Sequence, residues 1–226
     1  LHSFSDIYGN ALLLRHLQQA VAGGRVSHAY LLTGSAGSGK RLIADTFAKT
    51  LQCEAGGTEP CGHCKSCSAF NSGNHPDIVY VRPTKKTLGV DDVREQILED
   101  VSLKQYRYCY KIYIVEQADT MTVQAQNALL KTLEEPPAYA VFLLLAENQT
   151  AFLPTILSRL VWQPLPPAAA ADAALPQAEE ALQQEMLAKA EKLLSGFTKT
   201  VQENFPPLKK VKFYVNSKEI TDKNPV

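Results

Sequence analysis

The chain has 226 residues, enough to bury the core of one large domain or of two small ones. Lysine and arginine together number 23, and so do aspartate and glutamate, so the formal net charge is zero. A neutral chain has no overall attraction for nucleic acid or for an anionic membrane surface, so any DNA contact must come from a local patch or a partner.

The elements along the chain predict an α/β fold. The first ten residues, LHSFSDIYGN, have neither the basic nor the apolar region of a secretory signal, so we expect a cytoplasmic protein. Buried strands are predicted at residues 28–34, 77–81, 111–116 and 140–146. Helical spacing of apolar residues predicts helices at 10–24, 40–52, 90–102 and 122–135. Such strands, separated by helices, imply a parallel sheet covered on both faces, and the longest apolar run (138–146) is too short to span a bilayer.

A phosphate-binding loop is predicted between the first strand and the second helix, where GSAGSGKR fits the pattern G-x-x-x-x-G-K. Lys40 would reach the outer phosphates of a nucleotide. The backbone N–H groups that would surround the phosphates belong to Gly34, Ser35, Ala36, Gly37, Ser38 and Gly39. The next residue normally gives a hydroxyl to Mg²⁺, but here it is Arg41, which has no lone pair and would repel the ion. Two interpretations stay open: a loop that binds nucleotide, and one kept for its turn geometry that binds nucleotide weakly or not at all.

Four cysteines follow the second helix with the spacing C-x7-C-x2-C-x2-C, namely Cys53, Cys61, Cys64 and Cys67. Two-residue gaps let neighbouring thiolates converge on one ion, and four thiolates with no open position are typical of a structural Zn²⁺ site. We therefore predict a zinc module at about residues 53–67. The alternatives are four ordinary reduced cysteines, or an iron–sulfur cluster, for which no redox partner motif is present. The fifth cysteine, Cys109, is predicted to be a small packed residue.

The strand KIYIVE ends on Glu116, in the position of a magnesium-binding acid, and is followed by Gln117. Gln117 can orient a water molecule but cannot accept its proton, as a catalytic glutamate would. The alternative for Glu116 is a solvated carboxylate at a strand end. Further along, Arg159 lies in LPTILSRL, near a predicted helix end. It is either an ordinary surface charge or an arginine lent to a neighbouring phosphoryl-transfer site.

The composition changes near Pro164, where the segment QPLPPAAAADAALPQ begins, and every arginine, histidine and cysteine precedes this point. We predict one domain at 1–167 and an Ala/Pro-rich linker with a mainly helical segment at 168–226. An amphipathic helix is expected at 178–205 and a single strand at 209–215.

Taken in order, SHAYLLTGSAGSGK, the four-cysteine insertion, KIYIVEQADTM, QNALLKTLEEPP and LPTILSR resemble the bacterial clamp-loader AAA+ subunits of DNA polymerase III. The resemblance runs from about Phe4 to Pro167 and implies a P-loop AAA+ fold with zinc held by the four cysteines. Ser158–Arg159 is similar to the Ser-Arg-Cys motif of the family, with Leu160 in place of cysteine. The resemblance implies that Arg159 acts in trans, as an arginine finger at the ATP site of an adjacent gamma/tau subunit.

Within the family, Arg41 and Glu116–Gln117 resemble the delta-prime branch, whereas gamma/tau subunits typically have Thr and Asp-Glu at these positions. The resemblance implies a stator that contacts gamma/tau and delta subunits and supports ATP-driven loading of the sliding clamp on primed DNA, without hydrolysing ATP. Residues 168–226 are too short for both the lid and the collar of the family, so a truncated lid is one interpretation. The first alternative is an ATP-hydrolysing gamma/tau-type subunit. The second is a nucleic-acid-binding zinc module, although this module offers only Lys65 and His63 as cations.

Overall fold

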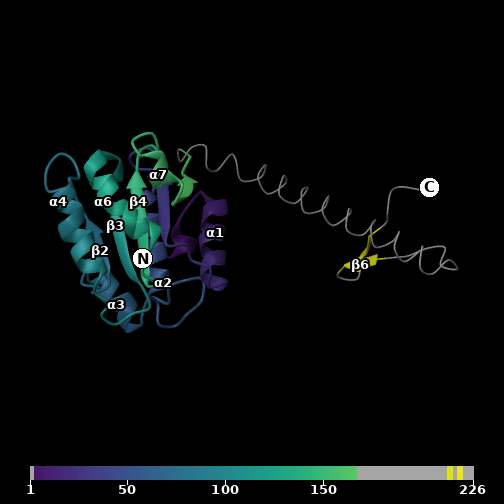
Figure 1. Cartoon of the computed structure of the whole chain (residues 1–226). Helices are drawn as coiled ribbons and strands as arrows, with labels where there is room; N and C mark the ends of the chain where they lie inside the picture. Colours follow the sequence, from purple (N-terminus) through teal and green to yellow (C-terminus); the bar gives the residue numbers. More distant parts are fainter. Residues whose placement is uncertain (1–2, 167–212, 216–217, 221–226) are drawn as a thin grey trace, which may run out of the picture. The chain divides into compact units, whose positions relative to one another are not determined.

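In a computed structural model of the chain, the described residues are 3–166, 213–215 and 218–220 (Figure 1). The chain divides into two units, Leu1–Leu175 and Pro176–Val226, which are taken separately. Among the described residues, no helix combines the length and the apolarity needed to cross a membrane.

The first unit holds a five-stranded parallel sheet with the strand order β2-β3-β4-β1-β5. The strands are β1 (Ala29–Thr33), β2 (Ile78–Val81), β3 (Lys111–Val115), β4 (Ala140–Ala146) and β5 (Val161–Pro164). In the centre, Leu31 of β1 lies opposite Leu144 of β4, and Ile114 of β3 lies opposite Leu143. All residues of β1, β3 and β4 are buried, which is why their sequences show no polar alternation. The four predicted strands and the parallel sheet are confirmed.

Helices cover both faces of this sheet (Figure 1). The helical elements are η1 (Phe4–Asp6), α1 (Ala11–Ala22), α2 (Lys40–Leu51), α3 (Lys65–Asn71), α4 (Val90–Val93), η2 (Arg94–Leu98), α5 (Glu99–Val101), η3 (Ala118–Thr120), α6 (Val123–Glu134) and α7 (Pro154–Leu157). On one face α1 and α2 pack against Tyr30, Leu32 and Ile114, with Phe47 of α2 fully buried. On the other face α4, η2 and α6 pack against inward-facing residues such as Tyr113.

Several elements differ from the sequence prediction, among them the short helix α3, which was not predicted. The helix expected at 90–102 is divided, because η2 is a π-helical turn between α4 and α5. The edge strand β5 was not predicted, since it is four residues long, ends on Pro164 and is only partly buried. The strand expected at 209–215 is confirmed for its described residues, β6 (Phe213–Val215), and it pairs with a strand that was not predicted, the antiparallel β7 (Lys218–Ile220), in the second unit. The predicted helix at 178–205 lies outside the described residues.

Candidate functional site

The predicted phosphate loop joins β1 to α2, as its sequence requires. Gly37 and Gly39 have φ angles of +77° and +86°, a left-handed conformation that glycine adopts without steric cost. The loop borders a cleft of about 790 Å³, which is lined by Gly37 to Leu42, by the residues that follow β3 and by the end of β4. The first three predicted loop residues, Gly34, Ser35 and Ala36, do not line this cleft.

Lys40, the first residue of α2, is turned back onto its own loop. Its ammonium group donates to the carbonyl oxygens of Gly34, at 2.5 Å, and Ser35, at 2.8 Å. Burial lowers the pKa of Lys40 below its ordinary value, although Glu147 and Asp119 act in the opposite direction. A phosphate group would therefore have to compete with two backbone carbonyls for this cation.

Arg41 joins α2 to the strands beside it through its guanidinium group. Its Nε lies 2.9 and 2.8 Å from the two carboxylate oxygens of Asp45, and its terminal nitrogen pairs with Glu116. The guanidinium also lies 4.3 Å from the ring centre of Tyr80, on β2. Burial by itself would lower the pKa of Arg41, but the charges of Asp45 and Glu116 outweigh it and raise that pKa.

Two further residues complete this cluster around Arg41. Arg82 also pairs with Glu116, at 3.1 Å, and the hydroxyl of Tyr80 donates to Asp45 at 3.2 Å. Burial and the charge of Asp45 raise the pKa of Tyr80 to about 12, so the phenol keeps its proton at neutral pH. Glu116 is thus engaged by two arginines, and the carboxylate predicted to hold Mg²⁺ already has cationic partners.

Carboxylates outnumber cations along the cleft. Lys40 and Arg41 are its cationic residues, whereas the acidic ones are Asp45, Glu116, Asp119 and Glu147. Gln117 follows Glu116 in a left-handed backbone conformation, with φ at +50°. Four carboxylates and two cations thus line the cleft, and Arg82 adds a third cation beside Glu116.

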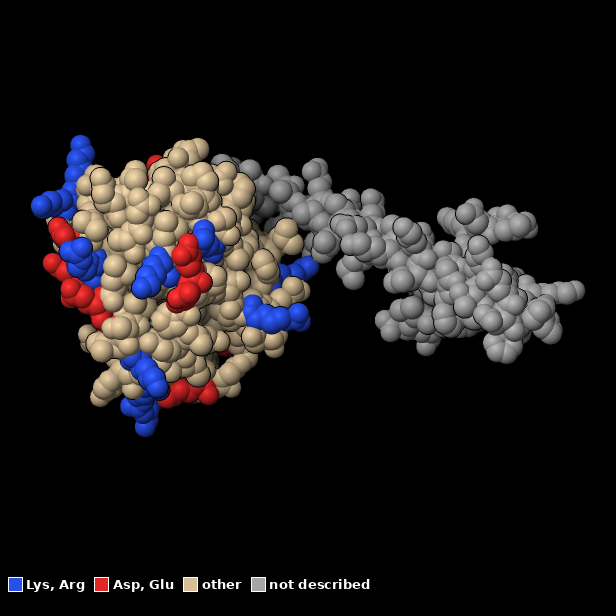
Figure 2. All heavy atoms as spheres, viewed as in Figure 1, with Lys and Arg blue, Asp and Glu red and all other residues tan. Residues whose placement is uncertain are grey.

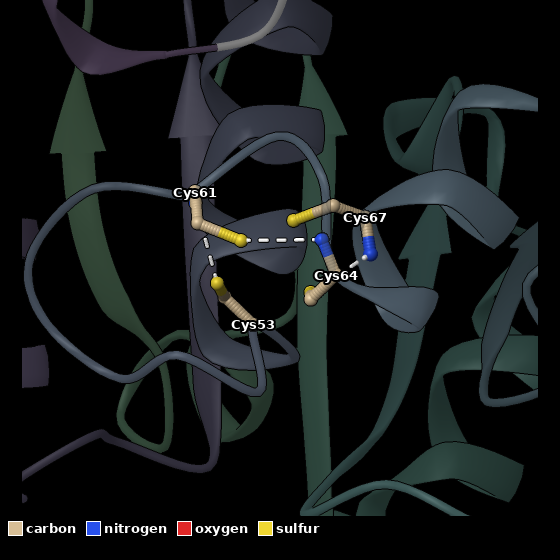
Figure 3. A group of neighbouring side chains, drawn as sticks. All are labelled: Cys53, Cys61, Cys64 and Cys67. Carbon is tan, nitrogen blue, oxygen red and sulfur yellow. Dashed lines mark hydrogen bonds between the residues drawn. The ribbon is translucent and has the colours of Figure 1, made fainter.

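The four predicted cysteine ligands come together at the end of α2 (Figure 3). Their sulfur atoms all lie within 4.8 Å of one another. Thiolates around a tetrahedral zinc ion, with Zn–S bonds of 2.3 Å, lie about 3.8 Å apart, so a small adjustment suffices. The chain can therefore hold a metal such as zinc here.

Backbone N–H groups support the sulfur atoms of this cluster. Cys61, Cys64 and Cys67 each donate a backbone hydrogen bond of 3.3 to 3.4 Å to the sulfur of the preceding cysteine of the set. Hydrogen bonds from the backbone of His63 and Cys64 lower the pKa of Cys61 to about 6, whereas burial raises that of Cys67 to about 12. Donors aimed at sulfur favour thiolates, the form in which cysteine binds metal. These hydrogen bonds therefore favour the form of the cysteines that can bind a metal cation.

The cysteine module also holds the start of the chain. Glu59 accepts hydrogen bonds from the Ser3 hydroxyl at 2.5 Å, the Phe4 backbone at 2.9 Å and the Gln18 amide at 2.7 Å. The module is thereby linked to η1 and α1. The remaining cysteine, Cys109, is exposed, so its prediction as a packed residue is wrong; it lies in the loop before β3 begins.

Arg159 lies just after α7 and is absent from the lining of the cleft. Its guanidinium pairs with Glu134, at the end of α6, at 2.6 Å, and donates to the Thr155 carbonyl at 2.6 Å. Its side chain is 32% exposed. Arg159 therefore lies outside the chain's own cleft but is within reach of a ligand presented from outside.

Sequence reasoning missed the partners of these residues. Asp45 could have been found, because it lies four residues after Arg41 on one helix, the spacing of an ion pair. Tyr80 and Arg82 carried no such signal, since only the packing of separate elements brings Tyr80 to Arg41 and Arg82 to Glu116. On the face shown in Figure 2, cations and acids are interspersed, and neither charge forms a continuous patch.

The family model and the curated relatives described here are subunits of DNA polymerase III. The family model described as DNA polymerase III, delta subunit, matches residues 9–169. The delta' subunit of DNA polymerase III from Pseudomonas aeruginosa is 43% identical over 155 residues, 66% of this chain and 47% of that protein. The tau/gamma subunit from Haemophilus influenzae is 39% identical over 158 residues, 70% of this chain and 23% of that protein.

A solved structure is similar as well. A gamma subunit-related protein of DNA polymerase III from Thermotoga maritima is 26% identical, with a TM-score of 0.51, over 69% of this chain and 45% of that one. The chain thus spans between about a quarter and about half of the length of these relatives.

Proposed function

Because the chain belongs to the DNA polymerase III delta subunit family of clamp-loader AAA+ proteins, we propose that it is a delta-prime-like stator of the loader. In this proposal the AAA+ domain, residues 1–167, gives the subunit its shape and position. The subunit contacts gamma/tau and delta subunits and supports ATP-driven loading of a sliding clamp on primed DNA. It hydrolyses no ATP itself, and Arg159 serves the ATP site of a gamma/tau neighbour.

One observation carries the stator proposal: the Arg41 guanidinium lies between Asp45 and Glu116. In an active P-loop site a Ser or Thr hydroxyl and an acid at the strand end hold Mg²⁺. Here a fixed cation already neutralises that acid, and a second cation beside it would be repelled. Since Gln117 cannot accept the proton of an attacking water molecule, the cleft lacks both parts of the hydrolytic chemistry.

The similarity to a tau/gamma subunit and the open cleft favour a second candidate, a gamma/tau-type ATPase. The two candidates differ in a simple assay of the purified chain. ATP turnover that is abolished by Lys40→Ala would support the ATPase and contradict the stator.

The role of Arg41 leads to a prediction about magnesium. In calorimetric titrations with ADP, the wild-type chain is expected to show no gain in affinity on addition of Mg²⁺. Arg41→Thr removes the fixed cation and supplies a hydroxyl, so we expect Mg²⁺ to increase its ADP affinity by at least about tenfold, or 1.4 kcal/mol.

Arg82→Thr is the matched control, because Arg82 also pairs with Glu116 but is 61% exposed and lies outside the cleft lining. With Arg82→Thr, as with the wild type, Mg²⁺ should not increase the affinity for ADP. Mg²⁺-dependent binding by the wild type itself would contradict the role given to Arg41.

We further propose that the ion held by the four cysteines is Zn²⁺ and that its role is structural. Four sulfur ligands with no open position support this assignment. When bound, zinc would cross-link the segment that follows α2, while the Glu59 contacts would extend its effect to the start of the chain.

A further inference from the structure

The ion pair between Arg159 and Glu134 joins two residues that are 25 positions apart in the sequence. Glu134 is the last residue of α6, and Arg159 follows α7. The same guanidinium donates to the Thr155 carbonyl at 2.6 Å and to the Ser158 hydroxyl at 3.2 Å. Its orientation is therefore defined by three contacts on two elements.

Both elements are anchored in the core while the charged groups stay accessible. Leu133 of α6 and Ile156 of α7 are each 1% exposed and belong to the same hydrophobic cluster. The side chains of Arg159 and Glu134 are 32% and 48% exposed. Because the backbones of α6 and α7 are fixed, the ion pair determines how the Arg159 guanidinium is oriented. An external anion can still reach this guanidinium.

The guanidinium also keeps donors available for such an anion. Arginine has five N–H donors, of which the three contacts occupy three. A phosphate group binds arginine most strongly through two parallel N–H donors, which requires a defined orientation of the guanidinium plane. An arginine on a free side chain would lose that orientation.

We infer that Glu134 is a positioning residue that holds the Arg159 guanidinium ready for the γ-phosphate of a neighbouring subunit. This inference rests on the proposed trans role of Arg159. An ion pair this exposed contributes little to folding, so the effect of Glu134 should fall on the reaction and not on stability.

The test is a double-mutant cycle in a clamp loader reconstituted with gamma/tau and delta subunits, with the ATPase as readout. Glu134→Gln is expected to lower kcat about tenfold, because small displacements of a positioned group cost up to about 10²-fold in rate. KM for ATP and the melting temperature of the chain should stay unchanged. Glu134→Asp, which keeps the carboxylate, should recover part of the loss.

In the Arg159→Ala background, Glu134→Gln should have no further effect, since its target is gone. Glu135→Gln is the matched control: Glu135 is the next residue and is also exposed, and its side chain makes no ion pair within the described part of the chain. It should behave as wild type.

The outcomes separate this inference from the proposed function. An Arg159→Ala loader with full activity would refute the proposed trans role of Arg159, on which the inference rests. A slow Arg159→Ala loader combined with an unchanged or faster Glu134→Gln loader would overturn the positioning role alone. A faster Glu134→Gln loader would mean that the carboxylate restrains the arginine. If Glu134→Gln lowered kcat further in the Arg159→Ala background, the positioning role of Glu134 would also be overturned.

Discussion

Arg159→Ala is expected to slow ATP hydrolysis at the adjacent gamma/tau site by about 10³- to 10⁵-fold, the range measured for arginine fingers. The cause is electrostatic, because the guanidinium stabilises the charge that develops on the transferred phosphoryl group. Arg159 lies outside its own cleft and is partly exposed, as a residue acting on another subunit must be. Single-turnover hydrolysis in a reconstituted loader measures the effect at that one site.

Two variants sharpen this prediction. Arg159→Lys keeps the charge but loses the planar arrangement of donors, so it should recover only a small part of the rate. Arg94→Ala is the matched control, because Arg94 is 61% exposed and its ion pair with Asp91, at 3.8 Å, is an ordinary surface contact. The loader should assemble with every variant. Unchanged hydrolysis with Arg159→Ala would refute the finger.

Removal of the metal is the second large effect that we expect. Structural zinc sites contribute roughly 10–16 kcal/mol of apparent binding free energy in small peptides, more than the whole stability of many domains. Cys67→Ser should therefore abolish zinc binding and lower the melting temperature strongly, since the Cys67 side chain is fully buried. Cys109→Ser is the matched control, because Cys109 is exposed and outside the cluster.

Elemental analysis should give one zinc per chain for the wild type and for Cys109→Ser. Because burial raises the pKa of Cys67 to about 12, its thiol is protonated at neutral pH until the metal displaces the proton. Zinc affinity should therefore fall as the pH falls. Iron, or no metal at all, in protein purified without chelator would contradict the site.

Hydrogen exchange should show how far the effect of the metal extends. The Phe4 backbone N–H donates to Glu59, a residue between the first two cysteines of the module. Addition of a chelator should accelerate the exchange of this amide while amides of β4 stay protected, since β4 lies at the centre of the sheet.

The sequence predicts those parts of the molecule that depend on local pattern. Buried strands such as β4 are visible as apolar runs, and the glycines of the phosphate loop and the spacing of the four cysteines impose a specific local geometry. Of the partners of Arg41 and Arg159, only Asp45 could be predicted in this way, from its spacing on the helix. Tyr80 reaches Arg41, and Glu134 reaches Arg159, through the packing of separate elements, which no short pattern encodes.

Helix α2 separates the two candidate sites of the chain. Lys40 and Arg41 are the first residues of this helix, whereas Cys53 follows its last turn. The cleft and the metal ligands therefore lie at opposite ends of one helix. Twelve residues at 1.5 Å per residue give a length of about 18 Å. A metal at that distance is too remote to polarise a phosphate or activate a water molecule. Its influence on the cleft can only be mechanical, through the fixed direction of a single helix axis.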